Sequence, residues 1–214
     1  MKSKIKRAMV AAIALWGVLF AFANPTRADT TIIEEWADVK APAAPELKPA
    51  RVDANVTAVL VLDIEERACN LERRPRCIAS VPKIKSLITK ARAKGISIVY
   101  SLTGRGTKES ILKEVAPLEG EPIVKSSVDK FYGTDLEKIL KEKGIKTVII
   151  VGTAANGAVL GTAIGAAMRK LNIIVPVDGM SDQPYSEQYV AWHLINAPGT
   201  RNYTTLTKIN MIEF

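Results

Sequence analysis

The hydrophobic positions of this chain form short apolar runs that alternate with longer amphipathic or alanine-rich stretches. Five runs have the continuous, β-branched character of buried strands, and they occupy Val56–Asp63, Ile96–Leu102, Thr147–Val151, Asn172–Val177 and Thr204–Ile209. The other stretches favour helices, which we expect over Val81–Lys94, Thr107–Val115, Thr134–Lys143, Ala158–Leu171 and Ser186–Asn196. Strands that alternate with helices are typical of a parallel sheet covered on both faces. The pattern therefore predicts a single α/β domain.

The stretch Thr147–Leu160 is the most informative part of this pattern. Its first five residues form an apolar run that ends at Gly152, and Asn156 and Gly157 then open the alanine-rich segment. Ligands of open α/β sheets bind beyond the carboxyl ends of strands, where a helix N-terminus presents unpaired N–H groups. We therefore expect the functional site at this turn.

The first residues of the chain have the composition of a secretory signal peptide. Basic residues at Lys2–Arg7 precede an apolar run, Ala8–Ala23, and Thr26-Arg27-Ala28 offers a cleavage site, with Ala21-Phe22-Ala23 as a second candidate. The run of 16 residues is shorter than the roughly 20 that a membrane-spanning helix needs, which disfavours a retained anchor. We expect residues 1–28 to be removed and the protein to be periplasmic or secreted, with no stable membrane anchor.

The remainder divides into an arm and a domain. Residues 29–55 are mixed polar and contain Pro42, Pro45 and Pro49, which predicts an extended N-terminal arm or linker. Residues 56–214 contain all the predicted strands and helices. The full chain has 214 residues, of which 48% are hydrophobic, and this is enough for one domain with a sizeable core.

The net charge gives little support to nucleic-acid binding. The chain carries a formal charge of +8, and five basic residues and no acidic ones lie within residues 1–28, so cleavage leaves +8 less 5, or +3. Such a mild excess argues against a nucleic-acid partner. Four arginines lie close together in the sequence after the first strand: Arg67, Arg73, Arg74 and Arg76. They either belong to a solvated loop or attract an anionic substrate.

The two cysteines, Cys69 and Cys77, lie eight positions apart in the same loop. Export favours a disulfide between them, and two free thiols are the alternative. This spacing is not typical of a metal site, and the chain has one histidine, His193, so we expect no zinc. We interpret His193 as a residue on a helix surface and not as a catalytic base.

Three strand ends are predicted to meet at one edge of the sheet. Asp63 ends the first strand, Lys125 lies before another helix start, and Ala158 follows the turn at Gly152. The turn does not match the dinucleotide-binding fingerprint, and the chain contains no P-loop. The predicted site therefore consists of charged side chains at a sheet edge, and we expect no cofactor.

These stretches resemble the isochorismatase-like hydrolases, also called the cysteine hydrolase family. The first resembling stretch is Val59–Asp63. The second is Lys125, followed six positions later by Phe131–Leu136, and the third is Gly152–Ala163. They occur in the family's order and at similar separations, over roughly residues 57–197. The resemblance implies a three-layer α/β/α sandwich with a six-stranded, mostly parallel sheet, and a cis peptide bond between Thr153 and Ala154.

The resemblance also implies a catalytic set of Asp, Lys and Cys. Asp63 and Lys125 match the first two, but Ala158 stands at the position of the nucleophilic cysteine, where alanine cannot form a thioester. A second departure is Glu65, where the family often has Gln.

Family members without the cysteine, isochorismatase among them, imply acid chemistry at this site. Asp63 would donate a proton, and Lys125 would tune its pKa and hold an anionic substrate. Backbone N–H groups around Gly157–Val159 would stabilise developing negative charge. The remaining residues that the resemblance places at the substrate are Thr153, Ala154 and Phe131.

Three hypotheses for the function follow, and the sequence leaves them open. The first is an exported hydrolase of a small molecule that uses Asp63 and Lys125 without a covalent step. The second is a catalytically inactive family member that binds a small molecule in the same pocket. The third is an engineered replacement of cysteine at Ala158. Export argues against isochorismate itself, an intracellular metabolite, as the substrate. Relatives often form homo-oligomers, but no feature of this sequence identifies an interface.

Overall fold

The computed structural model of the chain describes residues 30–214, so the predicted signal peptide lies outside the described residues. The chain divides into two units, which end at Ala43 and Phe214 respectively. In the first unit, residues 32–38 form turns. Within residues 30–214, the helices are too short or too polar to cross a membrane.

The second unit is built on a parallel sheet. Six strands lie in the order β4-β3-β2-β5-β6-β8, and the short β7 pairs with β5. Every ladder between these strands is parallel. Their bounds are β2 Thr57–Leu62, β3 Ser97–Leu102, β4 Ile123–Lys125, β5 Thr147–Thr153, β6 Asn172–Pro176, β7 Met180–Ser181 and β8 Thr204–Thr207. The predicted parallel α/β fold is confirmed.

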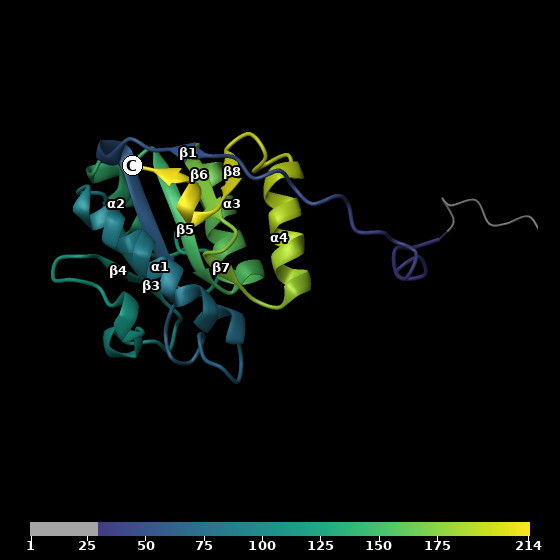
Figure 1. Cartoon of the computed structure of the whole chain (residues 1–214), viewed down its shortest axis with the longest axis horizontal. Helices are drawn as coiled ribbons and strands as arrows, with labels where there is room; N and C mark the ends of the chain where they lie inside the picture. The colour runs from purple at the N-terminus through teal and green to yellow at the C-terminus, as the bar shows by residue number, and fades with distance from the viewer. Residues whose placement is uncertain (1–29) are drawn as a thin grey trace, which may run out of the picture. The chain divides into compact units, whose positions relative to one another are not determined.

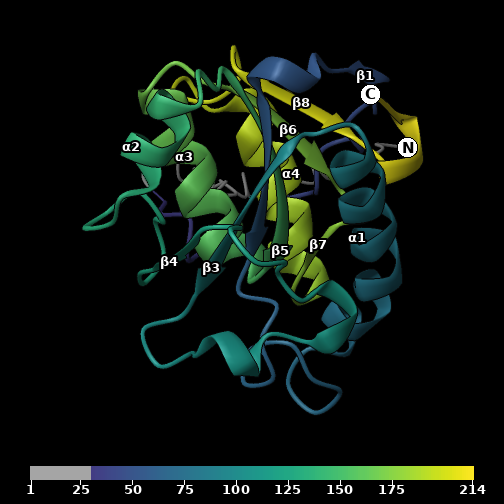
Figure 2. The ribbon, with the colours of Figure 1, turned by 90° about the vertical axis from the view of Figure 1, so that its left-hand side faces the viewer.

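Helices cover both faces of this sheet. Side chains on a strand alternate between faces, so Val59 and Val61 of β2 belong to one core and Ala58 and Leu60 to the other. The first core packs under α1, and the second packs under α2, α3 and α4, which gives three layers (Figures 1 and 2). The helix bounds are α1 Pro75–Ala93, α2 Leu136–Glu142, α3 Leu160–Met168 and α4 Pro184–Asn196.

Several elements begin or end away from the predicted positions. Helix α1 starts at Pro75, a residue favoured in the first turn of a helix, so the end of the predicted loop is helical. The expected helix at Thr107–Val115 is instead two 3₁₀ turns, η2 (Lys108–Ser110) and η3 (Lys113–Val115). Residues Ala155–Val159 form a π-helical turn, η4, before α3.

A small second sheet joins the first and the last strand of the domain. Strand β1 (Ala50–Arg51) pairs in parallel with β9 (Ile212–Glu213). Two further 3₁₀ turns flank these strands, η1 (Ala54–Val56) and η5 (Ile209–Met211). Strand β1 lies within the stretch 29–55 that we expected to be an extended arm, so the last residues of that stretch are paired with the domain.

Candidate active site

The site begins where β2 and β5 end side by side. Leu62, the last residue of β2, pairs in register with Gly152, and Asp63 follows directly after the strand. Gly152 has a φ of +130°, and a Cβ there would lie 2.0 Å from the carbonyl oxygen of Leu62. Only glycine therefore allows this close pairing. The peptide bond from Thr153 to Ala154 is cis, as the resemblance implied.

Asp63 is buried at this edge, with 4% of its surface exposed. Its backbone has a φ of +53° and its N–H donates to the carbonyl of Ser101. The Ser101 hydroxyl donates to Oδ1 of Asp63 at 2.7 Å. The ammonium of Lys130 lies 2.8 Å from Oδ2. Both carboxyl oxygens therefore have fixed partners inside the domain.

Lys130 is fully buried, and its ammonium group is surrounded by acceptors. Besides Asp63, it donates to the carbonyl oxygens of Ser127 at 2.7 Å, Ser126 at 3.0 Å and Leu102 at 3.4 Å. The Lys130 backbone N–H donates to Oγ1 of Thr162 on α3 at 3.2 Å. A buried ammonium needs such partners, and this set fixes its position.

The lysine beside Asp63 is thus Lys130 and not Lys125, the residue that we predicted. Lys125 ends β4 in register with Leu102 and is exposed. It does not line the cavity described below. The chain turns after β4, and this turn returns Lys130 to the interior while Lys125 stays on the surface.

Burial raises the pKa of the Asp63 carboxyl above its ordinary value. The charge and hydrogen bond of Lys130 and the hydrogen bond from Ser101 oppose this shift, and the negative charge of Glu65 adds to it. The pKa remains raised because desolvation is the largest of these effects. Such a shift prepares a carboxyl group to carry a proton that it can donate.

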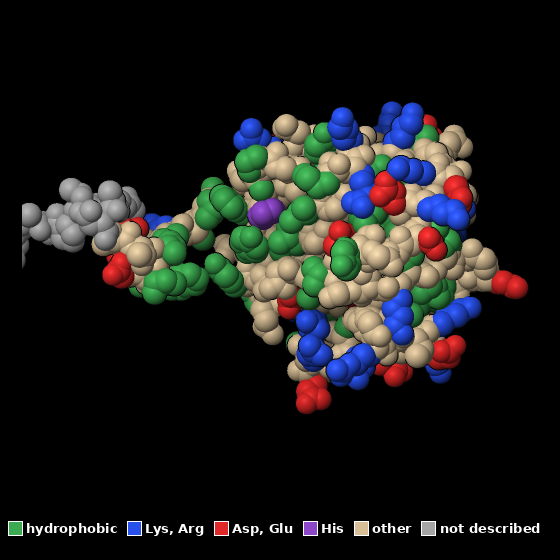
Figure 3. All heavy atoms as spheres, turned by 180° about the vertical axis from the view of Figure 1, so that it is seen from behind, with side chains coloured by type: hydrophobic (Ala, Val, Ile, Leu, Met, Phe, Trp, Pro, Cys, Tyr) green, Lys and Arg blue, Asp and Glu red, His purple; other side chains and the backbone are tan. Residues whose placement is uncertain are grey.

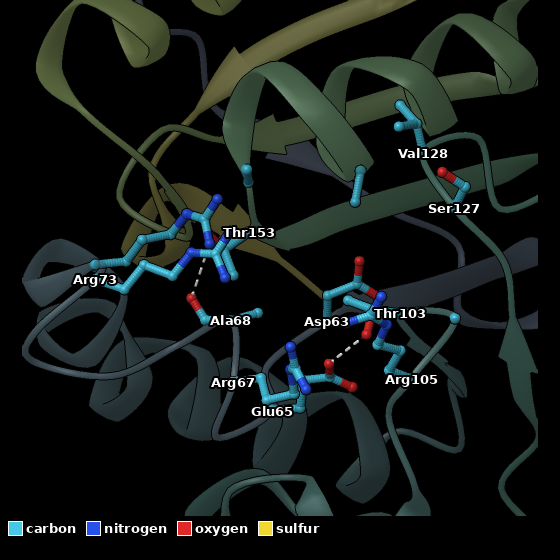
Figure 4. Close-up of a pocket in the computed structure, with 14 residues that line it drawn as sticks. Asp63, Glu65, Arg67, Ala68, Arg73, Thr103, Arg105, Ser127, Val128 and Thr153 are labelled. Atoms are coloured by element: carbon cyan, nitrogen blue, oxygen red, sulfur yellow. Dashed lines mark hydrogen bonds between the residues drawn. The ribbon is translucent and has the colours of Figure 1, made fainter.

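A cavity of about 480 Å³ opens above this edge of the sheet (Figure 4). Its size suits a small organic molecule. It is lined by Asp63, Glu65, Arg67, Ala68, Arg73, Arg74, Thr103, Gly104, Arg105, Ser127, Val128, Thr153, Ala154 and Ala158. Asp63 and Ala158 therefore border the same space.

The structure brings together some of the other predicted site residues and separates the rest. Thr153 and Ala154 line the cavity. Phe131 does not line it, because its ring is packed in the core with the Arg169 guanidinium 4.3 Å from its centroid. Gly157 and Val159 also lie outside the lining.

The amide groups of Gly157 and Val159 are already engaged. Both N–H groups donate to the carbonyl oxygen of Ala154, at 3.1 Å and 3.2 Å. They are therefore not available in this structure as the oxyanion-stabilising donors that we predicted from the helix start. The reason is the π-helical turn, which folds these amides back onto the end of β5.

Glu65 lies beside Asp63 with its side chain buried. The Thr103 hydroxyl donates to its Oε1 at 2.6 Å, and its Oε2 is buried without a hydrogen-bond partner. A Cβ at Gly106 would lie 1.8 Å from Oε2, so the turn after β3 packs closely against this carboxylate.

The loop after Asp63 is closed by a disulfide between Cys69 and Cys77. Arg67, Arg73 and Arg74 of this region line the cavity. Arg76 does not, because it forms an ion pair with Glu187 on α4. Three of the four arginines therefore lie at the cavity, and their attraction for an anionic substrate stays a prediction.

His193 lies on α4, outside the cavity lining, where its Nδ1 is 3.3 Å from the Tyr189 hydroxyl. Figure 3 shows it, in purple, on the surface beside hydrophobic side chains. This agrees with our interpretation of a helix-surface residue. Among residues 30–214, His, Cys, Asp and Glu side chains form no cluster of three or more that could hold a metal ion.

Sequence reasoning missed Lys130, Ser101 and Arg105. Lys130 directly precedes the Phe131–Leu136 stretch and could have been considered with it. Ser101 lies one residue before the end of β3. Neighbouring side chains of a strand point to opposite faces of the sheet, and this alternation alone was weak evidence for a site residue. Arg105 follows β3 in a loop without periodicity, and nothing in the sequence singled it out.

The parallel sheet and the charged cavity at its carboxyl edge define an α/β protein whose candidate site lies at the ends of its strands. The family model of the isochorismatase domain matches residues 57–207, and the chain belongs to this family.

Similar proteins include a secreted isochorismatase effector, Isc1, from Verticillium dahliae. It is 36% identical over 116 residues, which cover 49% of this chain and 61% of the effector. An uncharacterised isochorismatase family protein of Bacillus subtilis is 35% identical over 38% of this chain and 45% of its own length. The chain thus spans about three fifths or less of these curated relatives.

Solved structures share the fold. N-carbamoylsarcosine amidase from Thermoplasma acidophilum superposes with a TM-score of 0.63 at 23% identity, over 72% of this chain and 95% of the amidase. An isochorismatase family protein from Desulfovibrio vulgaris gives a TM-score of 0.65 at 19% identity, over 73% of this chain and 95% of that one.

Proposed function

We propose that this protein is an exported hydrolase of a small molecule that works by acid–base chemistry, without a covalent enzyme intermediate. The observation that carries the proposal is the buried pair of Asp63 and Lys130, of which Asp63 lines the same cavity as Ala158. The family resemblance assigns the nucleophile to position 158, and alanine has none. An acid with a raised pKa remains as the reactive group.

In this proposal Asp63 begins the reaction as a neutral carboxylic acid. With a vinyl ether as substrate, Asp63 transfers its proton to the terminal vinyl carbon, which produces an oxocarbenium ion. Water adds to that ion and loses a proton, and the resulting hemiketal separates into a carbonyl compound and an alcohol. The released proton restores the acid form of Asp63, so the cycle balances.

Lys130 has a positioning and electrostatic role in this scheme. Its ammonium, 2.8 Å from Oδ2, stabilises the carboxylate that Asp63 becomes after proton transfer. The Ser101 hydroxyl contributes in the same direction through Oδ1. The pair therefore lowers the barrier to proton donation without contributing a nucleophile.

Export is supported by three separate observations. Residues 1–28 have the composition of a signal peptide. The two cysteines form a disulfide, a bond that persists in oxidising compartments. A relative at 36% identity is a secreted effector. Mass spectrometry of the amino terminus of the protein recovered from its native compartment tests this part, and an intact residue 1 would contradict it.

A catalytically inactive binding protein is the second candidate, and Ala158 is the observation that favours it. The two functions are distinguished by turnover against a panel of vinyl ethers, amides and imides, beside an Asp63→Asn control. We expect turnover of at least one vinyl ether and its loss in the control. Binding of panel members in a thermal-shift assay without any turnover would instead favour the second candidate.

The Asp63→Asn variant leaves Lys130 without a negative partner, so its folding needs a separate check by circular dichroism. A Ser101→Ala variant keeps the ion pair and removes one hydrogen bond to the carboxylate. We expect it to remain active, with its pH dependence moved to higher pH. An unchanged pH dependence would contradict the role of Asp63 as the acid.

A further inference from the structure

Two tripeptides of the chain match the acceptor motif for N-linked glycosylation. In this motif asparagine is followed two positions later by serine or threonine, and the middle residue is not proline. The tripeptides are Asn55-Val56-Thr57 and Asn202-Tyr203-Thr204. Both asparagines are exposed in the structure. Glycans of this kind are attached to chains that leave the cytosol, so the motif has a meaning only for an exported protein.

The two motifs occupy the same place in the fold. Thr57 is the first residue of β2, and Thr204 is the first residue of β8. Because the ladders from β2 through β5 and β6 to β8 are all parallel, both strands begin at the edge of the sheet opposite the candidate site. Neither Asn55 nor Asn202 lines the cavity. A glycan on either asparagine therefore leaves the cavity open.

The hydroxyl groups of Thr57 and Thr204 contribute no hydrogen bond to the fold. Within residues 30–214, four buried side-chain oxygens lack a hydrogen-bond partner, and the Oγ1 atoms of these threonines are two of the four. Thr57 is 0% exposed as a whole. A buried hydroxyl without a hydrogen bond destabilises the folded state. Valine has the same shape and also favours strands, so folding alone gives no reason for threonine at these two positions.

We propose that Asn55 and Asn202 are N-glycosylated during export, and that Thr57 and Thr204 serve this modification. The inference rests on the export in the proposed function and is independent of catalysis. In the reaction, Nδ2 of the asparagine bonds to C1 of a sugar, and the bond between C1 and a phosphate oxygen of a lipid-linked oligosaccharide diphosphate breaks. The lipid diphosphate leaves, and the amide gives up one proton.

The folded structure accommodates the product at Asn55. The Nδ2 group donates to Oδ1 of Asp53 at 3.2 Å, and the Asn55 backbone N–H donates to the same oxygen at 2.9 Å. A side-chain amide has two N–H donors, so one remains for Asp53 after a sugar replaces the other. The Thr57 hydroxyl that belongs to the motif is buried once β2 has paired. The transfer therefore precedes folding of the domain.

The test is tandem mass spectrometry of the protein purified from its native compartment, with fragmentation that keeps glycans on their peptides. We expect a sugar mass on both Asn55 and Asn202. Asn210 is the internal control, because it is exposed but has Ile212 two positions later. An unmodified asparagine in either motif would overturn the proposal at that position. Sugar on Asn210 as often as on the other two would overturn the proposal as a whole.

Two substitutions at each threonine assign the effect to the motif. Thr57→Val removes the hydroxyl and keeps the shape, whereas Thr57→Ser keeps the hydroxyl and removes a methyl group. We expect Thr57→Val to abolish the sugar on Asn55 and Thr57→Ser to retain it. The same pair at Thr204 should act in the same way on Asn202. A sugar that persists in the valine variants would overturn the proposal.

Thermal unfolding of the same variants, made in a host without glycosylation, tests the argument about folding. Thr57→Val should unfold at the wild-type temperature or above it, because it no longer buries an unpaired hydroxyl. Thr57→Ser should unfold below the wild type, since a buried methyl group is lost. The opposite order of the two variants would show that the hydroxyl serves the fold, and would overturn the proposal.

This inference and the proposed hydrolase can fail separately. A processed amino terminus with unmodified Asn55 and Asn202 would overturn the glycosylation and leave export standing. Glycans on both asparagines without turnover of any substrate would sustain the modification sites and contradict the hydrolase. An intact residue 1 would contradict export and overturn this inference with it.

Discussion

The ammonium of Lys130 and the carboxyl of Asp63 form an ion pair inside the domain, with 2.8 Å between Nζ and Oδ2. The two residues come from the end of β2 and from the turn that follows β4. Neither is free to relax toward solvent, because Lys130 is fully buried and Asp63 is 4% exposed. Breaking this pair therefore leaves a charged group buried without its partner.

The first prediction separates the two candidate lysines by stability. Lys130→Met should lower the free energy of unfolding by about 3–5 kcal/mol, because it leaves a buried carboxyl group without its partner. Lys125→Met, at an exposed site, should change it by less than about 0.5 kcal/mol. Urea denaturation followed by circular dichroism measures both. Similar losses in the two variants would contradict the assignment of Lys130.

A second prediction concerns the coupling between the pair. Asp63→Asn alone leaves a buried ammonium without its counter-charge, whereas the double variant Asp63→Asn with Lys130→Met removes both charges. The double variant should therefore lose roughly 2 kcal/mol less than the sum of the single losses. A double-mutant cycle in urea gives this value directly. Simple additivity would mean that the two groups do not stabilise each other.

The third prediction is a pH dependence. The raised pKa of Asp63 means that its acid form persists to higher pH than that of an ordinary aspartate. Activity that needs this proton is present below the raised pKa and is lost as the pH rises through it. Because the charge of Glu65 adds to the raised pKa, Glu65→Gln should move this loss to lower pH. Profiles of kcat/KM against pH for both proteins measure the shift, and a move to higher pH would contradict the argument.

The free energy of unfolding should also depend on pH through the ionisation of Asp63. The folded state holds the Asp63 proton more tightly than the unfolded chain does, since folding raises the pKa of this carboxyl above its ordinary value. The contribution of this group is fully present below the unfolded pKa and is lost as the pH rises through the folded pKa. The unfolding free energy of the wild type, less that of the double variant Asp63→Asn with Lys130→Met, should therefore decrease across that interval. An increase would be inconsistent with a raised pKa.

The fourth prediction concerns the disulfide. Closing a loop of this length stabilises a fold by roughly 2–3 kcal/mol through the unfolded chain. Cys69→Ser with Cys77→Ser should remove that amount and should make urea unfolding insensitive to reductant. The wild type should lose a similar amount when reductant is added. A stability that reductant leaves unchanged in the wild type would show that the bond has no such effect.

The fifth prediction compares two glycines that both have positive φ. Gly144 (φ +64°) has no heavy atom within 4 Å of an added Cβ, so Gly144→Ala should cost about 1–2 kcal/mol of backbone strain. Gly152→Ala adds a collision with the Leu62 carbonyl and should cost more than about 4 kcal/mol. Thermal unfolding measures both, and equal costs would mean that β2 and β5 can move apart easily.

The fold was largely predictable because its strands are apolar on both faces. Runs such as Val148–Val151 have few alternatives to a buried parallel strand, and Asp63 follows from the end of such a run. The limits of helices were less predictable, because the start of α1 depends on a proline that also suits a loop.

The site was predictable only in part, since its details depend on chain turns. The resemblance favoured Lys125 by its distance from Phe131, but the path of residues 126–129 decides which ammonium enters the interior. In the same way, whether the amides of Gly157 and Val159 are free depends on the position of one carbonyl, that of Ala154. Local sequence pattern contains neither piece of information.

The disulfide between Cys69 and Cys77 has a practical consequence for inhibitors. These are the two cysteines of the chain, so the oxidised protein presents no thiol to an alkylating reagent. Iodoacetamide, maleimides and electrophilic warheads that disable cysteine-dependent enzymes have no cysteine thiol to attack here. Chemical control of this protein would require molecules that occupy its cavity reversibly, or reagents directed at carboxyl groups.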